Sequence, residues 1–489
     1  DILIAIFLGT SVFADAFFVA FRLPNTFRRL FAEGTFNAAF IPSYTSAQLK
    51  SQKEGKKFAD DVLSLLLLIL LFIVTLVEIF TPYLVYLIAP GFVDDNIKFN
   101  LAVEFTRITF PFLLFVSLSS FFSGILNSNN KFAVAAAAPI ILNIILIISI
   151  LISYFQSLNI AKYLSFGVTF AGVLQLIFLI FFTFKFYKPT IKLSFKITSK
   201  VKFFFKKLLP SIFSSGVTQI NILVGTIIAS FQSGAVSYLY YADRVNQLPL
   251  GVLGIAIGTA LLPVLSSQVK KNQKKEAEKS ISKAIKFGIL FSIPAFFGLF
   301  IFSENIISFL FFRGAFEYKD VQATSSALIA LCCGLPAFIM IKILVIPFFA
   351  NEDTKTPIKI SLFCMSINLI LNLILIREFL HVGLAISTSV SAWINFILLI
   401  YILNKNLNYS FDISIFKVFL KVSLASLTMS YIVLKTYEVM INNFEMYTLY
   451  NTNFILILCI IFGIIIYSAL MYFLGTKELE TNKWKIQKK

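Results

Sequence analysis

Long apolar runs separated by short polar breaks form the main pattern of the 489-residue chain. Runs such as 61–80, 140–155 and 453–474 approach or reach the roughly 20 residues that an α-helix needs to cross a bilayer. They show no alternation of polar and apolar positions, so they favour helices over a transmembrane barrel. The pattern therefore predicts an all-α, polytopic membrane protein.

Breaking the chain at its polar interruptions predicts about fourteen transmembrane helices. The predicted spans are 1–10, 12–48, 58–89, 98–127, 132–155, 160–184, 207–231, 234–268, 284–311, 321–350, 356–376, 382–403, 414–436 and 449–474. Several are longer than a bilayer requires, and we expect these to tilt or project. The first is short and begins at Asp1, so we expect a truncated first helix.

Positive charge gathers in alternate breaks of this pattern. Lysines crowd 50–57, 185–207, 270–279 and the tail "KWKIQKK", whereas the intervening breaks are acidic, mixed or neutral. The positive-inside rule places the basic breaks and the C-terminus in the cytoplasm. Topology thus explains the net charge of +18, and no nucleic-acid partner is expected.

The residue inventory argues against catalysis. The four cysteines lie in apolar segments and the chain has one histidine, so neither a disulfide frame nor a metal site is predicted. No nucleophile–base set or phosphate-cradling glycine motif appears, so we expect no catalytic residue, no ATP, no cofactor and no enzyme. Coupling to the membrane potential or to a monovalent cation stays open. Segments 208–231 and 357–376 hold no carboxylate, which weakens sodium coupling but leaves an amide and carbonyl site open.

The chain also repeats itself. "NAAFIPSYTSAQLK" (37–50) resembles "GTALLPVLSSQVKK" (258–271), and "LNIILI" (142–147) resembles "LNLILI" (371–376). Paired motifs keep their order at an offset near 221–229 residues. Two halves of about six helices with the same topology are typical of transporters with parallel repeats. The predicted organisation is an N-lobe (1–184), a basic cytoplasmic linker (185–206), a C-lobe (207–403), helices 13 and 14 (404–476) and a cytoplasmic tail (477–489).

Several charges fall inside predicted spans, where each costs several kcal/mol unless it meets a partner or water. The 12–48 span carries Asp15, Arg22, Arg28, Arg29 and Glu33. Steps of seven place Asp15, Arg22 and Arg29 on one face of a continuous helix, but Pro24 is expected to break that phase. Helix geometry therefore does not choose between Arg28 and Arg29.

The second half offers Asp243 and Arg244 in its own second helix, and Lys342 in the middle of 321–350. A cavity lined by these groups would be cationic, and the planar fork of arginine suits a phosphate or pyrophosphate on a lipid.

The alternative is local ion pairs, Asp15 with Arg22 and Asp243 with Arg244, with Arg28 and Arg29 at an interface. Function is favoured for Arg28 and Arg244, because both halves place an arginine in the equivalent helix. Both interpretations stay open for Lys342, and a structural role is favoured for Glu104 and Arg107, which are near a helix start.

Two long motifs carry a family resemblance. "DAFFVAFRLPNTFRRLFAEGTFNAAFIP" (15–42) and "YYADRVNQLPLGVLGIAIGTALLP" (240–263) closely resemble motifs of the MurJ/MviN family. These are the lipid II flippases of the multidrug/oligosaccharidyl-lipid/polysaccharide exporter superfamily. "FRGAF" (312–316) and "DTKTPIKI" (353–360) fit as well, so the resemblance covers essentially the whole chain.

The resemblance implies fourteen helices, with two six-helix lobes in a V around a central cavity and two extra helices forming a lipid-side groove. It implies movement of lipid II, the undecaprenyl-pyrophosphate-linked disaccharide peptide, to the outer leaflet of the bacterial cytoplasmic membrane for peptidoglycan biosynthesis and cell shape. By position, Asp15, Arg28 and Arg244 match charged cavity residues of the family. Further motif positions with less defined roles are matched by Asn25, Glu33 and Asp243. The family carries more arginines just before the position of Asp1, where this sequence begins, and we expect that a truncation accounts for their absence.

Expected partners are lipid II, membrane lipids and proteins of cell-wall synthesis, and a monomer is expected. Another exporter of the superfamily, either a polysaccharide-lipid flippase or a drug/cation antiporter, is one alternative; an antiporter would prefer acidic and aromatic cavity groups. A membrane scaffold for cell-wall enzymes is the other, and it would tolerate Arg28→Ala and Arg244→Ala.

Overall fold

The computed structural model describes residues 1–32, 35–190, 202, 204, 206, 216, 219–407, 409, 412–443 and 449–475. The chain divides into two compact units. Unit 1 is Asp1–Ser237 with Arg313–Phe316, and unit 2 is Tyr238–Phe312 with Glu317–Lys489. Most of the predicted linker 185–206 and all of the predicted tail 477–489 lie outside the described residues, and the predicted lobe boundaries stay a prediction.

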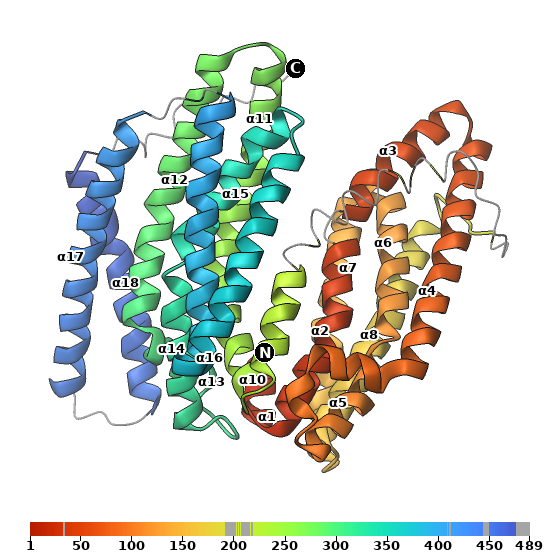
Figure 1. Cartoon of the computed structure of the whole chain (residues 1–489), viewed down its shortest axis with the longest axis horizontal. Helices are drawn as coiled ribbons and strands as arrows, with labels where there is room; N and C mark the ends of the chain where they lie inside the picture. The colour runs from red at the N-terminus through yellow and green to blue at the C-terminus, as the bar shows by residue number, and fades with distance from the viewer. Residues whose placement is uncertain are drawn as a thin grey trace. The chain divides into compact units, whose positions relative to one another are not determined.

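Unit 1 is built from helices drawn from red to yellow-green in Figure 1. They are α1 (Ile2–Leu8), α2 (Val12–Ala32), α3 (Thr35–Lys50), α4 (Gln52–Ile88), the 3₁₀ turn η1 (Pro90–Phe92), α5 (Asn96–Thr109), α6 (Phe112–Ser128), α7 (Phe132–Phe155), α8 (Ile160–Thr183) and the short helix Gln219–Ala229. Helix α8 packs against both α6 and α7, and α2 packs against α5.

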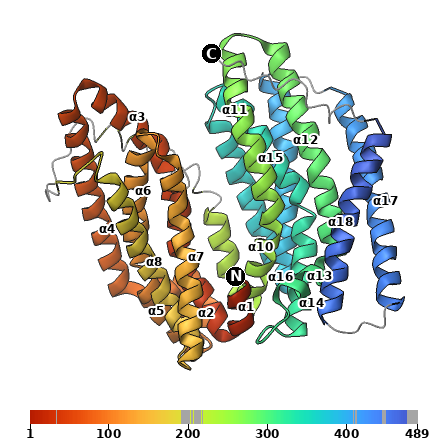
Figure 2. The ribbon, with the colours of Figure 1, turned by 180° about the vertical axis from the view of Figure 1, so that it is seen from behind.

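Unit 2 takes up the rest of the chain. Its elements are α10 (Ala235–Pro249, whose first three residues belong to unit 1), the π-helical turn η2 (Leu250–Gly254), α11 (Ile255–Lys270), α12 (Lys274–Ile301), α13 (Ser303–Phe311), α14 (Tyr318–Cys332), α15 (Leu335–Ala350), α16 (Lys355–Leu407), α17 (Ser414–Asn443) and α18 (Leu449–Phe473). Helices α17 and α18, which follow the predicted repeat, lie side by side next to α12 in both Figure 1 and Figure 2.

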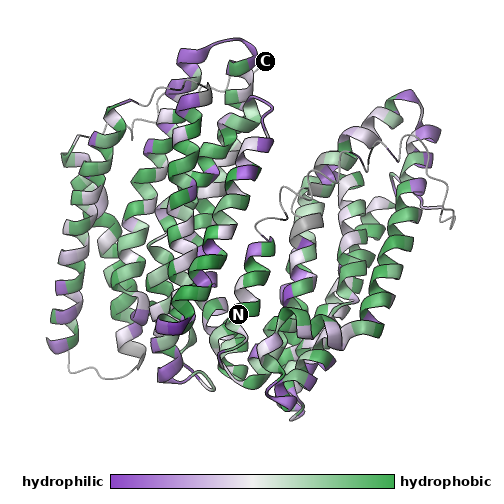
Figure 3. Cartoon of the chain, viewed as in Figure 1, coloured by the Kyte–Doolittle hydropathy of each residue, from purple (hydrophilic) through white to green (hydrophobic). Residues whose placement is uncertain are grey.

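The described elements confirm an all-α, polytopic membrane protein. Within the described residues, 9 helices are long and apolar enough to span a membrane, or up to 10 when one bent pair is counted as a span. Figure 3 shows hydrophobic residues along the helices and hydrophilic residues gathered at many of their ends. The predicted count of fourteen helices, like the V-shaped arrangement, stays a prediction.

Several predicted spans are broken helices. The 98–127 span consists of α5 and α6, and the 321–350 span consists of α14 and α15, which meet at an angle of 42°. The predicted break between 376 and 382 falls inside α16, at Leu380, where φ is 51° and the two halves meet at a kink. A positive φ is costly for a leucine, so this kink depends on the packing around it.

Several helices contain prolines, and each such proline leaves the carbonyl four residues earlier without its usual amide donor. The prediction that Pro24 breaks the helix phase is wrong, because α2 continues through it. The freed carbonyl of Ala20 accepts a hydrogen bond from the buried Thr109 hydroxyl of α5 at 3.1 Å. A hydroxyl group thus replaces the missing backbone donor.

The same device recurs elsewhere. Pro82 of α4 frees the carbonyl of Glu78, which accepts from the Thr81 hydroxyl at 3.1 Å. Pro294 of α12 frees the carbonyl of Leu290, which accepts from the Tyr467 hydroxyl of α18 at 2.6 Å. The Tyr467 bond also ties α18 to α12, so it supports the packing of the two C-terminal helices on unit 2.

The "FRGAF" motif (312–316) lies between α13 and α14, and most of it belongs to unit 1. The Ala315 amide donates to the Ile6 carbonyl of α1 at 2.7 Å. Gly314 has φ +60°, and a Cβ atom there would lie 2.3 Å from the Ile6 oxygen. Only glycine fits this position without displacing α1.

The predicted basic linker begins at the end of α8, where its first residues are fixed to α4. The Tyr187 hydroxyl and the Thr190 amide both donate to Asp60 Oδ1, at 2.6 and 2.9 Å. Burial, and then the hydrogen bond to this carboxylate, raises the pKa of the Tyr187 phenol. The described start of this segment is therefore fixed to α4.

Candidate functional site

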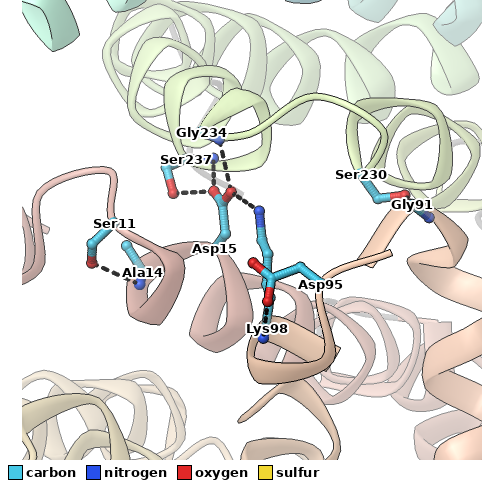
Figure 4. Close-up of polar contacts among 9 residues, drawn as sticks. All are labelled: Ser11, Ala14, Asp15, Gly91, Asp95, Lys98, Ser230, Gly234 and Ser237. Carbon is cyan, nitrogen blue, oxygen red and sulfur yellow. Dashed lines mark hydrogen bonds and ion pairs between the residues drawn. The ribbon is translucent and has the colours of Figure 1, made fainter. Parts of the chain in front are cut away.

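Asp15 lies on α2 at the centre of a buried polar cluster in unit 1, shown in Figure 4. Its side chain is 1% exposed and pairs with the Lys98 ammonium of α5 at 2.6 Å. Its two oxygens also accept from the Gly234 amide at 2.9 Å and from the amide and hydroxyl of Ser237 at 3.0 and 2.5 Å. Four protein donors therefore share one carboxylate.

This carboxylate caps α10 from another helix. The first amides of a helix have no partner within it, and a side chain directly before the helix usually satisfies them. Gly234 precedes α10 and has no side chain, so Asp15 supplies the acceptor. A negative charge at the start of α10 is also favoured by the helix dipole.

Neighbouring residues position the same cluster. The Asp95 carboxylate caps α5 by accepting from the Ile97 and Lys98 amides at 3.0 and 3.1 Å. This cap sets the first turn of α5, from which the Lys98 side chain reaches Asp15 and passes 4.2 Å from the centre of the Phe92 ring. Here Asp15 pairs with Lys98 and not with Arg22, so the predicted local pair with Arg22 is wrong.

Lys98, Gly234 and Ser237 were missed by the sequence argument. The available signal was a lysine just after two aspartates, "DDNIK", in a break that otherwise lacks basic residues. The structure assigns Asp15 a positioning role inside unit 1. Its predicted contact with a headgroup stays a prediction.

Arg28 lies about one turn before the end of the described part of α2 and is half-buried. Its Nε donates to the Asn25 side-chain oxygen at 2.9 Å, one turn earlier on the helix. Asn25 therefore orients the guanidinium. Arg22 is also half-buried, and its Nε donates to the Thr226 hydroxyl at 3.0 Å, which ties α2 to the helix Gln219–Ala229. Of the other predicted residues of this span, Glu33 and the side chain of Arg29 lie outside the described residues.

Arg244 is half-buried on α10 in unit 2. Its Nη2 donates to the Tyr240 hydroxyl at 2.7 Å, and its guanidinium carbon lies 4.7 Å from the centre of the same ring. Tyr240 thus holds Arg244 by a hydrogen bond and a cation–π contact. The neighbouring Asp243 accepts from the Gln247 amide one turn later. Both charged residues are therefore oriented by neighbours on their own helix.

Lys342 is exposed although it lies in the middle of the apolar helix α15. Its side chain lies beside Gly254, where a Cβ atom would be 3.4 Å from the Lys342 Cγ. Gly254 ends η2, a π-helical turn of the kind that often marks functional sites. A charge exposed at mid-span is favoured only where water reaches it, and the predicted place of Lys342 in a hydrated cavity stays a prediction.

Unit 2 also holds an apolar cavity of about 750 Å³. It is lined by the end of α10, by α12 and α13, and by α17 and α18. Its lining includes Leu290 and Phe291 of α12, Met429 of α17, and Ile460 and Gly463 of α18. The two C-terminal helices therefore form one wall of a space suited to hydrocarbon.

These features define a class, namely a polytopic α-helical transporter with oriented arginines on α2 and α10 and an apolar cavity beside its last two helices. The sequence model of the family described as "Lipid II flippase MurJ" matches residues 4–455. The chain belongs to this family, which is a family of transporters and not of enzymes. It is a multi-pass protein of the bacterial inner membrane.

Two curated relatives illustrate the match. A probable lipid II flippase MurJ from Rickettsia prowazekii (strain Madrid E) is 41% identical over 395 residues, covering 80% of this chain and 77% of the relative. One from Buchnera aphidicola subsp. Schizaphis graminum (strain Sg) is 34% identical over 494 residues, covering 100% and 95%. The similarity extends over essentially the whole chain.

Solved structures agree with the family. The structure described as lipid II flippase MurJ in an inward closed conformation is 30% identical, with a TM-score of 0.83, and covers 97% of this chain and 95% of that one. A multidrug resistance MATE family transporter of the MOP superfamily has a TM-score of 0.70 at 15% identity and covers 84% and 94%. At that identity the second likeness shows the fold alone.

Proposed function

We propose that this protein moves lipid II from the inner to the outer leaflet of the cytoplasmic membrane by alternating access. Family membership over essentially the whole chain is the observation that carries the proposal. The oriented arginines give the family function a chemical basis in this chain, because lipid II presents a pyrophosphate between its sugar and its polyprenyl tail.

In this proposal Arg28 and Arg244 bind the pyrophosphate. Asn25 and Tyr240 hold one donor of each guanidinium, which lowers the side-chain entropy lost when the remaining donors bind an anion. Hydrogen bonds between charged groups contribute roughly 1.5–3 kcal/mol each. Loss of either arginine should therefore weaken cargo binding by about tenfold or more.

The polyprenyl tail would lie in the apolar cavity beside α17 and α18. Its lining is almost entirely hydrocarbon, with few polar groups such as Ser430 and Ser468. A chain of isoprene units can leave lipid for such a cavity at little cost, because both environments are apolar. Lys342, exposed on α15, would face the hydrated headgroup.

Depletion with complementation tests the proposal. Cells depleted of their own flippase receive Arg28→Ala, Arg244→Ala or Arg377→Ala, and lipid II in the outer leaflet is measured after membrane expression has been verified. Arg377 is an exposed arginine of α16 and serves as the control. Translocation should fail with the first two variants and persist with the third.

Sustained translocation with Arg28→Ala and Arg244→Ala would refute the assignment of the pyrophosphate site. Wild-type protein that supports growth without moving lipid II would favour a scaffold for cell-wall enzymes. Export of a cationic drug in exchange for a cation would favour the antiporter. The C-terminus in the cytoplasm, the monomer, and contacts with other cell-wall proteins are part of the proposal.

The driving force is proposed to be the membrane potential acting on the cationic residues, at about 2.3 kcal/mol per charge per 100 mV. In unit 2 the Asn372 amide donates to Asn368 at 3.0 Å, and Asn368 donates to the Ser391 hydroxyl at 3.4 Å. These buried amides link the two halves of α16, as polar residues commonly do between membrane helices. A monovalent cation bound by amide and carbonyl oxygens is the alternative.

A further inference from the structure

We propose that unit 1 carries a binding site for one glycerophospholipid, with the phosphodiester at Arg107 and an acyl chain in the groove that runs from it along α8. This site is separate from the arginines proposed to hold lipid II. It is built from Glu104 and Arg107 of α5, Lys162 of α8 and an apolar groove between α7 and α8.

The polar end of the site has a volume of about 480 Å³ and is lined by Asn100, Glu104, Arg107 and Lys162. Lys162 and Glu104 form an ion pair at 2.7 Å, and each side chain is 43% exposed. Arg107, one turn after Glu104, is exposed. Among the residues that the structure describes, its guanidinium makes no hydrogen bond or ion pair, and its electrostatic neighbour is Glu78 of α4.

Arg107 is therefore the group with donors to offer. Glu104 is already matched by Lys162, so the guanidinium can present its planar fork to a phosphodiester with two hydrogen bonds. The two cations, Arg107 and Lys162, are balanced by two carboxylates, Glu104 and Glu78. A headgroup that carries a single phosphate charge, or a phosphate and an ammonium, suits this balance better than a highly charged anion does.

An apolar groove of about 750 Å³ continues from the same residues. Arg107, Ile108 and Phe166 line both spaces, so the polar end and the groove are contiguous. The groove runs over Phe170 and Val173 of α8 and is bordered by Ser149 and Ile152 of α7. The Thr169 hydroxyl donates to the Ile108 carbonyl and fixes α8 to α5 along the floor.

The depth of the groove matches one leaflet. Asn159 caps α8 by accepting from the Lys162 amide at 3.1 Å, so Lys162 lies in the first turn of the span, at the membrane surface. Val173 lies eleven residues later, which is about 16 Å along the helix at ~1.5 Å per residue. Half of a ~30 Å hydrocarbon core is about 15 Å. The charged end thus lies where headgroups are, and the apolar part spans one acyl layer on the side of the 156–159 loop.

Native mass spectrometry of the full chain in nonionic detergent tests the proposal. The probes are phosphatidylglycerol, phosphatidylethanolamine and diacylglycerol with the same acyl chains. Wild-type protein should bind a first phospholipid molecule at a lower concentration than it binds further phospholipid molecules. It should show no such tight binding of diacylglycerol. Phosphatidylglycerol and phosphatidylethanolamine distinguish a single phosphate charge from a zwitterion as the preferred head.

Arg107→Ala should lower the apparent affinity for that first phospholipid by about tenfold, the effect of one charge-assisted pair. Arg107→Lys keeps the charge but loses the planar fork, so its apparent affinity should lie between those of wild type and Arg107→Ala. Arg377→Ala is the matched control, an exposed arginine on α16 that lines neither space, and should have no effect. Equal binding by Arg107→Ala and wild type, or equal retention of diacylglycerol, would overturn the proposal.

A second variant tests the groove without touching the charges. Val173→Trp fills the acyl part and should weaken phospholipid binding as strongly as Arg107→Ala does. Thermal unfolding in lipid-free detergent verifies that each variant is folded. A folded Val173→Trp protein that binds the phospholipid like wild type would show that the groove holds no acyl chain.

Discussion

Asp15→Asn is the substitution whose effect on stability follows most directly from the structure. The carboxylate is buried, pairs with Lys98 and accepts from the first turn of α10. Asparagine has nearly the same shape but no charge, and one of its side-chain atoms is a donor that would face other donors. The change leaves the Lys98 ammonium buried without its counter-charge, which costs about 3–5 kcal/mol.

The two partners of the pair are not equivalent. Lys98→Met leaves Asp15 with three donors and the positive end of the α10 dipole. It should therefore lower the stability less than Asp15→Asn does. The double variant Asp15→Asn/Lys98→Met removes the unpaired ammonium and should recover part of the loss. The two effects are therefore expected to be non-additive.

Thermal unfolding of the purified protein measures these differences. For a unit of this size, a loss of 3–5 kcal/mol corresponds to a fall in Tm of roughly 10 °C. Asp94→Asn is the matched control, since Asp94 is exposed in the loop before α5, and it should leave Tm within a degree or so of wild type. A Tm for Asp15→Asn equal to that of Asp94→Asn, or strict additivity with Lys98→Met, would refute the reasoning.

Three further predictions rest on other parts of the molecule. Thr109→Val removes the donor to the carbonyl that Pro24 frees and should destabilise unit 1 by about 1–3 kcal/mol in thermal unfolding, whereas Thr109→Ser keeps the hydroxyl and should cost less. Gly314→Ala places a Cβ atom 2.3 Å from the Ile6 oxygen at a positive φ and should lower Tm, whereas Gly298→Ala, with open space around its Cβ position, should not. In proteoliposomes, an imposed potassium diffusion potential should change the rate of lipid II translocation at equal sodium on both sides; a rate that follows only the sodium gradient would contradict coupling to the potential.

The hydrophobic pattern was sufficient to predict an all-α membrane protein and its long apolar segments, because a bilayer requires such segments wherever the chain crosses it. It did not predict how spans break, since a break depends on contacts from elsewhere in the chain. Pro24 illustrates the limit. Sequence favours a disrupted helix there, and the helix continues because Thr109, 89 residues away in sequence, supplies a hydroxyl to Ala20.

The candidate site residues were likewise only partly predictable from the sequence. Sequence identified the helices that carry charge, but it did not separate charges that hold the fold from charges that face a ligand. Asp15 and Arg28 lie on the same helix and looked alike in the sequence. In the structure Asp15 is enclosed by Lys98 and by the start of α10, where Gly234 lies 219 residues later in the sequence. Arg28 is instead half-buried and oriented by Asn25, one turn earlier on the same helix.

Charge inside a membrane segment is therefore a weak guide to ligand binding until its partners are known. An ionised group such as Asp15, whose hydrogen-bonding capacity is filled by buried protein atoms, has few acceptor positions free for a cargo. Its removal should therefore first lower the stability of the protein. A group such as Lys342, exposed in the middle of an apolar helix, is less desolvated and keeps donors for water or an anion. This distinction makes stability and translocation separable measurements. Asp15 variants should lose both together, whereas Lys342→Met should lose translocation at an unchanged Tm.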